Sequence, residues 1–164
     1  MPRSIGRPGT VPEVAISVRR AELRDIRDIR NIDALVYRTP WSERLTIQEV
    51  RGSNRVHFVA ERQHTVVGHG AIAFLANTAH VTTIAVHPNS QRTGVGRGLM
   101  AELFAAAEAG HCREVTLEVR ETNSVAIAFY KTLGLTRAGI RTGYYADTGE
   151  DALIMSTAST VPDS

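Results

Sequence analysis

The spacing of hydrophobic residues in the first third of this 164-residue chain predicts two helices. Residues 21–36 carry apolar side chains three or four positions apart, the period of a helix that buries one face. Those apolar positions are Leu23, Ile26, Ile29, Ile32 and Val36. Residues 39–51 hold a proline-containing turn followed by a shorter helical pattern, and Ser42 is a candidate N-cap for it.

Two more helices are predicted in the second half of the chain. The apolar run 99–109 ends next to Gly110, and glycine is common directly after a helix. The segment 123–134 begins with Asn123, a good capping residue, and ends with a glycine.

Short runs of alternating or continuous apolar residues predict the strands. They occupy residues 15–21, 55–61, 66–76, 79–86, 114–119, 135–146 and 150–156. The second and third form a hairpin around residues 62–65. The element order is βααβββαβαββ, which predicts an α/β fold with a mixed sheet, since strands outnumber the helices available to connect them. We expect one domain over residues 15–158, with tails at 1–14 and 159–164.

Composition narrows the function classes. A net charge of +2 is too small to indicate nucleic acid as the main partner. No apolar run approaches the roughly 18–20 residues that cross a bilayer, and the first residues lack the apolar region of a signal peptide. Cys112 is the only cysteine, so an internal disulfide is impossible and a reducing cytoplasm is the simplest setting. The six histidines show no metal-binding spacing, and no metal is expected.

The stretch QRTGVGRGLM, residues 91–100, places glycines at the start of a predicted helix. The first N–H groups of a helix have no partner inside it and attract anions, and glycine lets a phosphate approach the backbone. Gly94, Gly96 and Gly98 therefore predict a pyrophosphate seat, flanked by Arg92 and Arg97. The spelling excludes a Walker loop and a dinucleotide fingerprint. The alternative is a glycine-rich turn that merely lets a helix pack closely on a strand.

The segment Q-x-x-G-x-G, from Gln91 to Gly96, follows a strand directly and resembles the acetyl-CoA loop of the GNAT acetyltransferase superfamily. A second block resembles the same superfamily: Asn123, Ala126, Tyr130 and Gly134 stand in the pattern N-x-x-A-x-x-x-Y-x-x-x-G. Within the superfamily the chain is similar to the RimI family. TTIAVHP before the loop, PWS at 40–42 and YY…EDALIM at 144–155 carry this narrower likeness.

The resemblance implies a GNAT fold, in which a mixed sheet with helices on both faces has two central parallel strands that splay apart around acetyl-CoA. Here these strands are 79–86 and 114–119. The residues implied in cofactor binding are Ile84, Ala85, Val86, Arg92, Thr93, Gly94, Val95, Gly96, Arg97, Asn123 and Lys131. The first three would offer backbone groups that the sheet leaves unpaired.

The resemblance also assigns the chemistry of acetyl transfer. Glu118 is the candidate base, directly or through water, and Tyr130 is the candidate acid for the leaving thiolate. The Val86 N–H is the expected oxyanion donor. The residues alone favour other interpretations: Glu118 as a solvent-facing strand carboxylate, with Glu121 as a nearby competitor for the role of base, and Tyr130 as a residue whose ring packs in the core.

Trp41, Tyr144 and Tyr145 are expected to line the acceptor side, with ordinary surface packing as the alternative. Gly143 and the segment 77–79 depart from the RimI pattern and put the acceptor in question. The expected function is N-α-acetylation of a protein N-terminus, by resemblance the N-terminal alanine of a small-subunit ribosomal protein. The alternatives are a GNAT enzyme that acetylates lysines or a small amine, and a non-enzymatic acyl-CoA-binding module.

Overall fold

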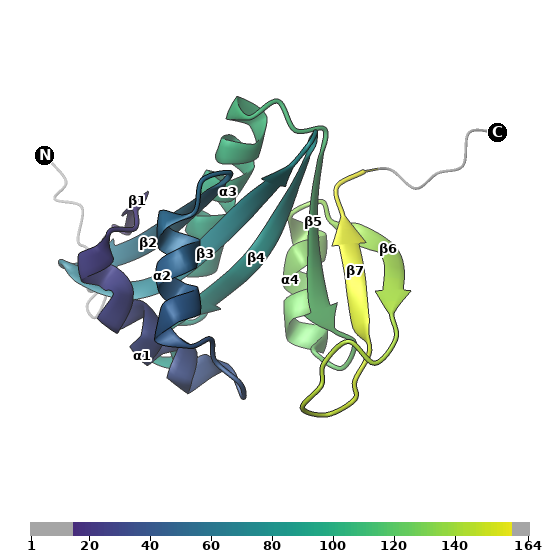
Figure 1. Cartoon of the computed structure of the whole chain (residues 1–164), viewed down its shortest axis with the longest axis horizontal. Coiled ribbons are helices and arrows are strands. Elements are labelled where there is room, and N and C mark those ends of the chain that lie inside the picture. Colours follow the sequence, from purple (N-terminus) through teal and green to yellow (C-terminus); the bar gives the residue numbers. More distant parts are fainter. Residues whose placement is uncertain (1–14, 159–164) are drawn as a thin grey trace, which may run out of the picture.

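A computed structural model describes residues 15–158, which fold around one seven-stranded mixed sheet in the order β1-β2-β3-β4-β5-β7-β6 (Figure 1). The strands are β1 Ser17–Arg20, β2 Arg55–Arg62, β3 Thr65–Leu75, β4 Thr78–Val86, β5 Glu114–Arg120, β6 Thr136–Arg141 and β7 Ala152–Ser156. The α-helices of the described residues are α1 Ile26–Val36, α2 Glu43–Arg51, α3 Val95–Ala109 and α4 Ser124–Thr132. The predicted order of elements is confirmed. None of these helices has the length and apolarity needed to span a bilayer.

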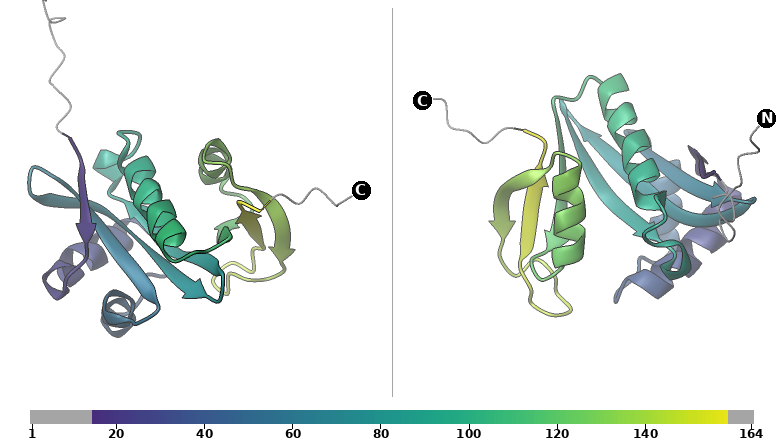
Figure 2. Two further views of the ribbon diagram at one scale, coloured as in Figure 1. Left: turned by 90° about the horizontal axis from the view of Figure 1, so that it is seen from above. Right: turned by 180° about the vertical axis from the view of Figure 1, so that it is seen from behind.

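Helices cover both faces of the sheet: α1 and α2 lie on one face, and α3 and α4 lie on the other (Figure 2). The predicted apolar stripe of α1 is buried at Ile26, Ile29 and Ile32. Helix α3 buries Leu99, Met100 and Leu103 against the opposite face. The sheet is therefore the middle layer of a three-layer fold.

Three predicted helix ends are confirmed in detail. The Ser42 hydroxyl accepts a hydrogen bond from the Leu45 N–H (3.2 Å), and the Asn123 side chain accepts one from the Ala126 N–H (3.2 Å). Gly134 follows α4 with φ of +92°, a left-handed conformation that glycine adopts without strain.

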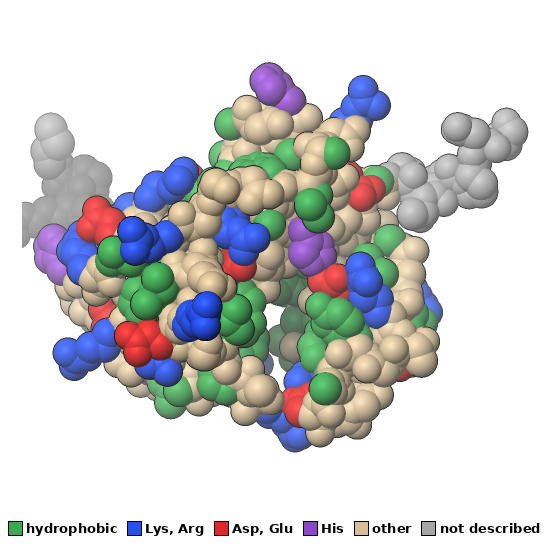
Figure 3. Space-filling view, viewed as in Figure 1, with side chains coloured by type: hydrophobic (Ala, Val, Ile, Leu, Met, Phe, Trp, Pro, Cys, Tyr) green, Lys and Arg blue, Asp and Glu red, His purple; other side chains and the backbone are tan. Residues whose placement is uncertain are grey.

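The two central parallel strands separate partway along their length. Pairing between β4 and β5 runs only from Thr78–Glu114 to His80–Thr116, although β4 continues to Val86 and β5 to Arg120. Figure 1 shows the V-shaped opening, and the space-filling view is hollowed at the same place (Figure 3). Backbone groups along the opening have no partner in the adjacent strand and are paired by side chains or left for a ligand: the Ile84 carbonyl accepts from the Tyr37 hydroxyl (2.7 Å), and the Val86 carbonyl accepts from the Gln91 side chain (3.3 Å).

A β-bulge on β4 lies next to this opening. The register between β3 and β4 shifts so that Val81 and Thr83 face successive residues of β3, which leaves Thr82 without an opposite residue. The neighbouring Thr82 and Thr83 hydroxyls consequently both reach the α1/α2 face, where they contact Glu49 (3.2 Å) and Tyr37 (3.1 Å). Bulges are frequent beside active sites because they redirect side chains.

The predicted strand 135–146 is wrong at its C-terminal end. Strand β6 stops at Arg141, and residues 142–151 form a loop. Gly143 has φ of +61°, and its N–H bonds to the Asp151 carboxylate (2.8 Å) instead of to a neighbouring strand. Tyr144 and Tyr145 therefore belong to a loop. The expected tails at 1–14 and 159–164 lie outside the described residues.

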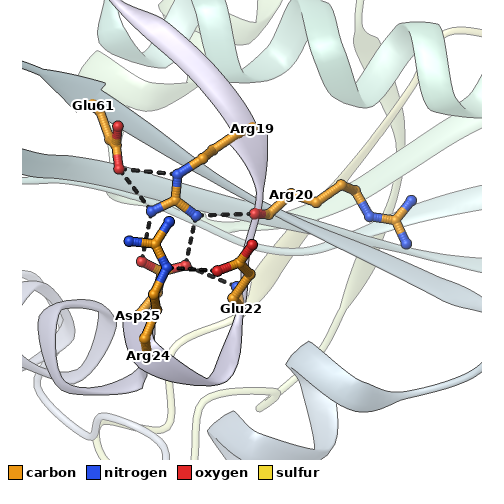
Figure 4. Close-up of polar contacts among 6 residues, drawn as sticks. All are labelled: Arg19, Arg20, Glu22, Arg24, Asp25 and Glu61. Atoms are coloured by element: carbon orange, nitrogen blue, oxygen red, sulfur yellow. Dashed lines mark hydrogen bonds and ion pairs between the residues drawn. The ribbon is translucent and has the colours of Figure 1, made fainter. Parts of the chain in front are cut away.

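An ion-pair network fastens the first strand to the start of α1 (Figure 4). The Arg19 guanidinium donates to both oxygens of Asp25 (2.8 Å each) and to Glu61 on β2 (2.6 and 2.9 Å). Burial raises the pKa of Asp25, but the bonds from Arg19 and from the Glu22 N–H outweigh it, so the net pKa lies below its usual value. This network joins the edge strand β1 to β2 and to the start of α1.

Candidate functional site

A cavity of about 700 Å³ fills the opening between β4 and β5. The end of α1, the two parted strands, α4 and the 142–151 loop all contribute to its wall. The sequence-predicted residues that it brings together are Trp41, Ile84, Glu118, Asn123, Tyr130, Tyr144 and Tyr145. Ala85, Val86, Lys131 and residues 92–97 are not among the lining residues.

The N-terminus of α3 carries backbone N–H groups without helical partners at the place where the sequence predicted them. Gly94 is the N-cap, with a left-handed φ of +91°, and the first intrahelical bond runs from the Gly98 N–H to the Gly94 carbonyl (3.0 Å). The N–H groups of Val95, Gly96 and Arg97 precede that bond and have no partner within the helix. Gly98 was predicted to belong to the pyrophosphate seat, but its N–H already bonds to the Gly94 carbonyl and cannot serve as a free donor.

The glycines of this loop are not required for close packing of α3. A Cβ on Gly96 would lie 3.4 Å from Phe129 and 3.8 Å from Val86, and one on Gly98 would lie 3.9 Å from Val18, all ordinary contacts. The tight approach occurs on β3, where a Cβ on Gly68 would lie 2.8 Å from Val95. This disfavours the packing-turn alternative, and the open space in this loop lies at Gly94, where a Cβ would have no neighbour within 4 Å.

Basic side chains surround the same helix end. Arg92, Arg97 and Lys131 are exposed, and the Arg97 guanidinium contacts the Thr132 hydroxyl (3.3 Å). Arg62, at the end of β2, donates to the Thr93 hydroxyl (3.1 Å). The sequence did not point to Arg62, because only the folded hairpin brings it to this loop. Positive charge at a helix N-terminus suits an anionic diphosphate.

Strand β4 offers two residues to the opening instead of the three predicted. The His87 N–H donates to the Val67 carbonyl of β3 (2.8 Å), and backbone groups of an antiparallel strand alternate in direction. Ala85 therefore turns its backbone groups to its β3 partner His69, and the expectation that they are unpaired is wrong. Ile84 and Val86 turn theirs to the opening.

Glu118 lies between two basic side chains on the face of β5 that lines the cavity. Its Oε2 is 2.5 Å from His80 Nε2, its Oε1 is 3.1 Å from Arg141 Nε, and only 11% of the side chain is exposed. The hydrogen bond from His80 lowers the pKa of Glu118 most; burial opposes it, and the charges of His80 and Arg141 add to the lowering. The net pKa lies below the usual value, so the carboxylate is ionised at neutral pH.

Tyr130 is both a core residue and a residue of the cavity wall, so its position agrees with both interpretations of the sequence. Its ring belongs to the main hydrophobic cluster and is 8% exposed, and its side chain also lines the cavity. Burial raises the pKa of Tyr130, so the phenol keeps its proton at physiological pH. A protonated phenol can serve as an acid.

Arg120 at the end of β5 fixes the loop that carries the two predicted tyrosines. Its guanidinium pairs with Asp147 (2.8 Å) and lies 4.0 Å from the centre of the Tyr145 ring. Tyr144 packs edge-on against Tyr145, with ring centres 5.1 Å apart. These contacts shape the cavity wall opposite α1.

Several residues of the site were missed by sequence reasoning. The Tyr37 hydroxyl donates to the Ile84 carbonyl (2.7 Å), and burial raises the pKa of Tyr37 to about 12. Asp33 lines the cavity and bonds to His69 (2.6 Å), which contacts His57 (2.9 Å). The sequence offered one signal for Asp33: it is a polar residue directly beside the apolar stripe of α1.

Comparison with known proteins identifies the family. The model of the Acetyltransferase (GNAT) family matches residues 23–135. The chain is 32% identical over 142 residues to the [Ribosomal protein bS18]-alanine N-acetyltransferase of Escherichia coli (strain K12), covering 85% of this chain and 95% of that protein. It is 35% identical to the N-alpha-acetyltransferase RimI of Mycobacterium tuberculosis, covering 75% and 78%.

The crystal structure of the ribosomal-protein-S18-alanine N-acetyltransferase from Escherichia coli superposes with a TM-score of 0.80 at 28% identity, covering 92% of this chain and 99% of that one. The parted strands, the exposed helix N-terminus and these matches agree. The chain therefore belongs to the GNAT family of acetyltransferases, within it to the RimI group, and is an acetyl-transferring enzyme.

Proposed function

We propose that this enzyme transfers the acetyl group of acetyl-CoA to the α-amine of a protein N-terminus, with the N-terminal alanine of a ribosomal protein as the acceptor. The observation that carries the proposal is that an ionised, largely buried carboxylate and a protonated phenol line the same cavity in the opening between β4 and β5. The names of the relatives in Escherichia coli and Mycobacterium tuberculosis support the acceptor class.

The residues of the α3 N-terminus fit the diphosphate of acetyl-CoA. The N–H groups from Val95 to Arg97, which lack partners within the helix, supply donors, and the open space at Gly94 allows close approach. Arg92, Arg97 and Lys131 supply positive charge, and Asn123 lines the cavity nearer the reacting end. Backbone groups of Ile84 and Val86 suit the amides of the pantetheine arm.

The acetyl group arrives as a thioester, which an uncharged amine can attack directly. Glu118 takes the proton from the incoming amine, directly or through one water. The Val86 N–H donates to the carbonyl oxygen as negative charge develops on it. Tyr130 gives its proton to the departing thiolate.

An α-amine suits this site better than a lysine. With a pKa of about 7.7–8.0, roughly a quarter to a half of an α-amine is uncharged near pH 7.5, against about one lysine in a thousand. Because its pKa is lowered, Glu118 is a weak base that is ionised at neutral pH. Such a base serves an acceptor that already loses its proton easily.

A peptide panel tests the proposal. Wild-type enzyme and acetyl-CoA are incubated with peptides that begin with Ala, Ser or Met, with an N-terminally blocked peptide carrying lysine, and with a polyamine. Mass spectrometry should find acetyl groups on the α-amine, most rapidly on the Ala peptide. Modification of only lysine or the polyamine would assign the enzyme to a different acceptor, and CoA binding without turnover of any amine would indicate a binding module.

A further inference from the structure

His80 occupies the last paired position of β4 before the two central strands part. Its register partner is Thr116, and its ring reaches the same face of β5 as Glu118. Nε2 lies 2.5 Å from Glu118 Oε2, and Nδ1 lies 2.6 Å from Thr116 Oγ1. No sequence motif singled out this histidine.

Whenever the His80 ring is neutral, the two contacts select one of its tautomers. An ionised carboxylate only accepts hydrogen bonds, so Nε2 carries the hydrogen that faces Glu118. In the neutral ring Nδ1 is then an acceptor, and the Thr116 hydroxyl donates to it. Thr116 thereby orients the ring, and the ring orients the carboxylate.

The strand opening explains why such support is needed. Beyond His80–Thr116 there is no β4 pairing to limit the movement of β5 on this side, while Arg141 reaches the other carboxylate oxygen from β6 (3.1 Å). The Arg141 side chain is 56% exposed, whereas that of His80 is 25% exposed. The less exposed contact is the better fixed of the two.

We propose that His80 is a positioning residue for Glu118: oriented by Thr116, it holds the carboxylate toward the acceptor amine at the point where the strands part. The proposal rests on the proposed function, since Glu118 is its base. The charged and titratable groups that face Glu118 are His80 from β4, Arg141 from β6 and Tyr145 from the 142–151 loop.

The test compares His80→Ala with His80→Gln, whose side-chain amide keeps a donor near the position of Nε2. His80→Ala should lower kcat about tenfold, the effect of losing a hydrogen bond to a charged group, with little change in the KM for acetyl-CoA. His80→Gln should recover most of this loss. In a Glu118→Gln background, His80→Ala should have no further effect on kcat, because its only route to the reaction is gone.

A second measurement needs no turnover. Carbon-13 NMR of the Glu118 carboxyl group should show a higher pKa in His80→Ala than in wild type, and the acidic limb of the kcat profile should move to higher pH with it. An unchanged Glu118 titration would overturn the proposal, as would equal loss of kcat, acetyl-CoA affinity and thermal stability in both His80 variants. If wild type fails to acetylate any peptide, the proposed function falls, while the titration still decides whether His80 controls Glu118.

Discussion

The two ends of the site are built in different ways. At the α3 end, the donors are consecutive backbone N–H groups from one short stretch, Val95 to Arg97. At the acceptor end, the groups are side chains from distant segments: Glu118 from β5, His80 from β4, Arg141 from β6 and Arg120 anchoring the 142–151 loop.

This difference separates binding of the cofactor from selection of the acceptor amine. Backbone donors at a helix start are tolerant of side-chain change. Binding at the α3 end therefore depends only on space near the backbone and on positive charge. The acceptor end depends on the relative placement of several strands, so it is sensitive to single side chains. Damage at the two ends should therefore appear in different kinetic constants.

The largest effect is expected at the base. Glu118→Gln keeps the shape of the side chain but removes its ability to accept a proton, so kcat should fall by a factor of about 100 or more, with acetyl-CoA affinity unchanged. Steady-state kinetics with the Ala peptide measure both constants. The matched control is Glu121→Gln, an exposed carboxylate just beyond β5. Equal losses in the two variants would remove the special role of Glu118.

Tyr130→Phe should have the next largest effect. The variant keeps the packed ring but loses the proton for the thiolate, so kcat should fall by about 10- to 100-fold at constant acetyl-CoA affinity. Thermal denaturation should change little, because the buried ring remains. A weakened affinity for acetyl-CoA with normal kcat would show that the hydroxyl serves in binding.

A methyl group at Gly96 should act only on the cofactor end. The added Cβ would lie in ordinary contact with Phe129 and Val86, so the fold tolerates it, but it crowds the helix turn that carries the diphosphate donors; acetyl-CoA affinity should therefore fall about tenfold without loss of stability. Gly98→Ala is the control, with its Cβ near Val18, and should instead stabilise α3 by up to about 1 kcal/mol. Calorimetric titration with acetyl-CoA separates the two. Normal affinity in Gly96→Ala would move the diphosphate elsewhere.

Arg120→Met should act only on the acceptor end. Losing the pairing with Asp147 and the contact with Tyr145 frees the 142–151 loop, so the KM for peptide should rise about fivefold while acetyl-CoA affinity stays constant. Arg137→Met, at an exposed position of β6, provides the comparison. A peptide KM that both substitutions leave unchanged would mean that the loop does not contact the acceptor.

The last prediction concerns stability instead of turnover, and it involves the buried contacts of His57 and His69 behind Asp33 of α1. Burial, followed by the neighbouring His69, lowers the pKa of His57 to about 3. The folded chain keeps His57 neutral while the unfolded chain gains a proton below about pH 6.5, so stability should fall as pH drops from 6.5 toward 3, by at most about 1.4 kcal/mol per unit.

His57→Phe should flatten this dependence between pH 7 and pH 4. Urea denaturation of both proteins across that range measures it. Parallel curves would show that other groups govern the acid sensitivity.

Local patterns predicted the local features of the fold. The α1 stripe, the caps at Ser42 and Asn123 and the exposed start of α3 depend on residues close in sequence, and each is present. The end of β6 was missed because Gly143 and Asp151, eight residues apart, close a loop where the apolar pattern suggested a strand. The sequence did not predict that the backbone groups of Ala85 point toward β3, because their direction depends on the register between β3 and β4.

The acceptor end was predictable only in part. Glu118 and Tyr130 were located by resemblance, but their surroundings require the fold. His80 reaches Glu118 from its register position opposite Thr116, and Arg141 reaches it from a strand that is not a direct neighbour of β5. Neither relation leaves a periodic signal in the sequence.

Backbone NMR during titration with coenzyme A tests the central claim most directly, because it reports on each N–H group separately. We expect the largest chemical-shift changes at the N–H groups of Val95, Gly96 and Arg97, and smaller changes at those of Ile84 and Val86. Shifts confined to residues of α1 and α2, or no saturable change at all, would contradict the assignment of the strand opening as the acetyl-CoA site.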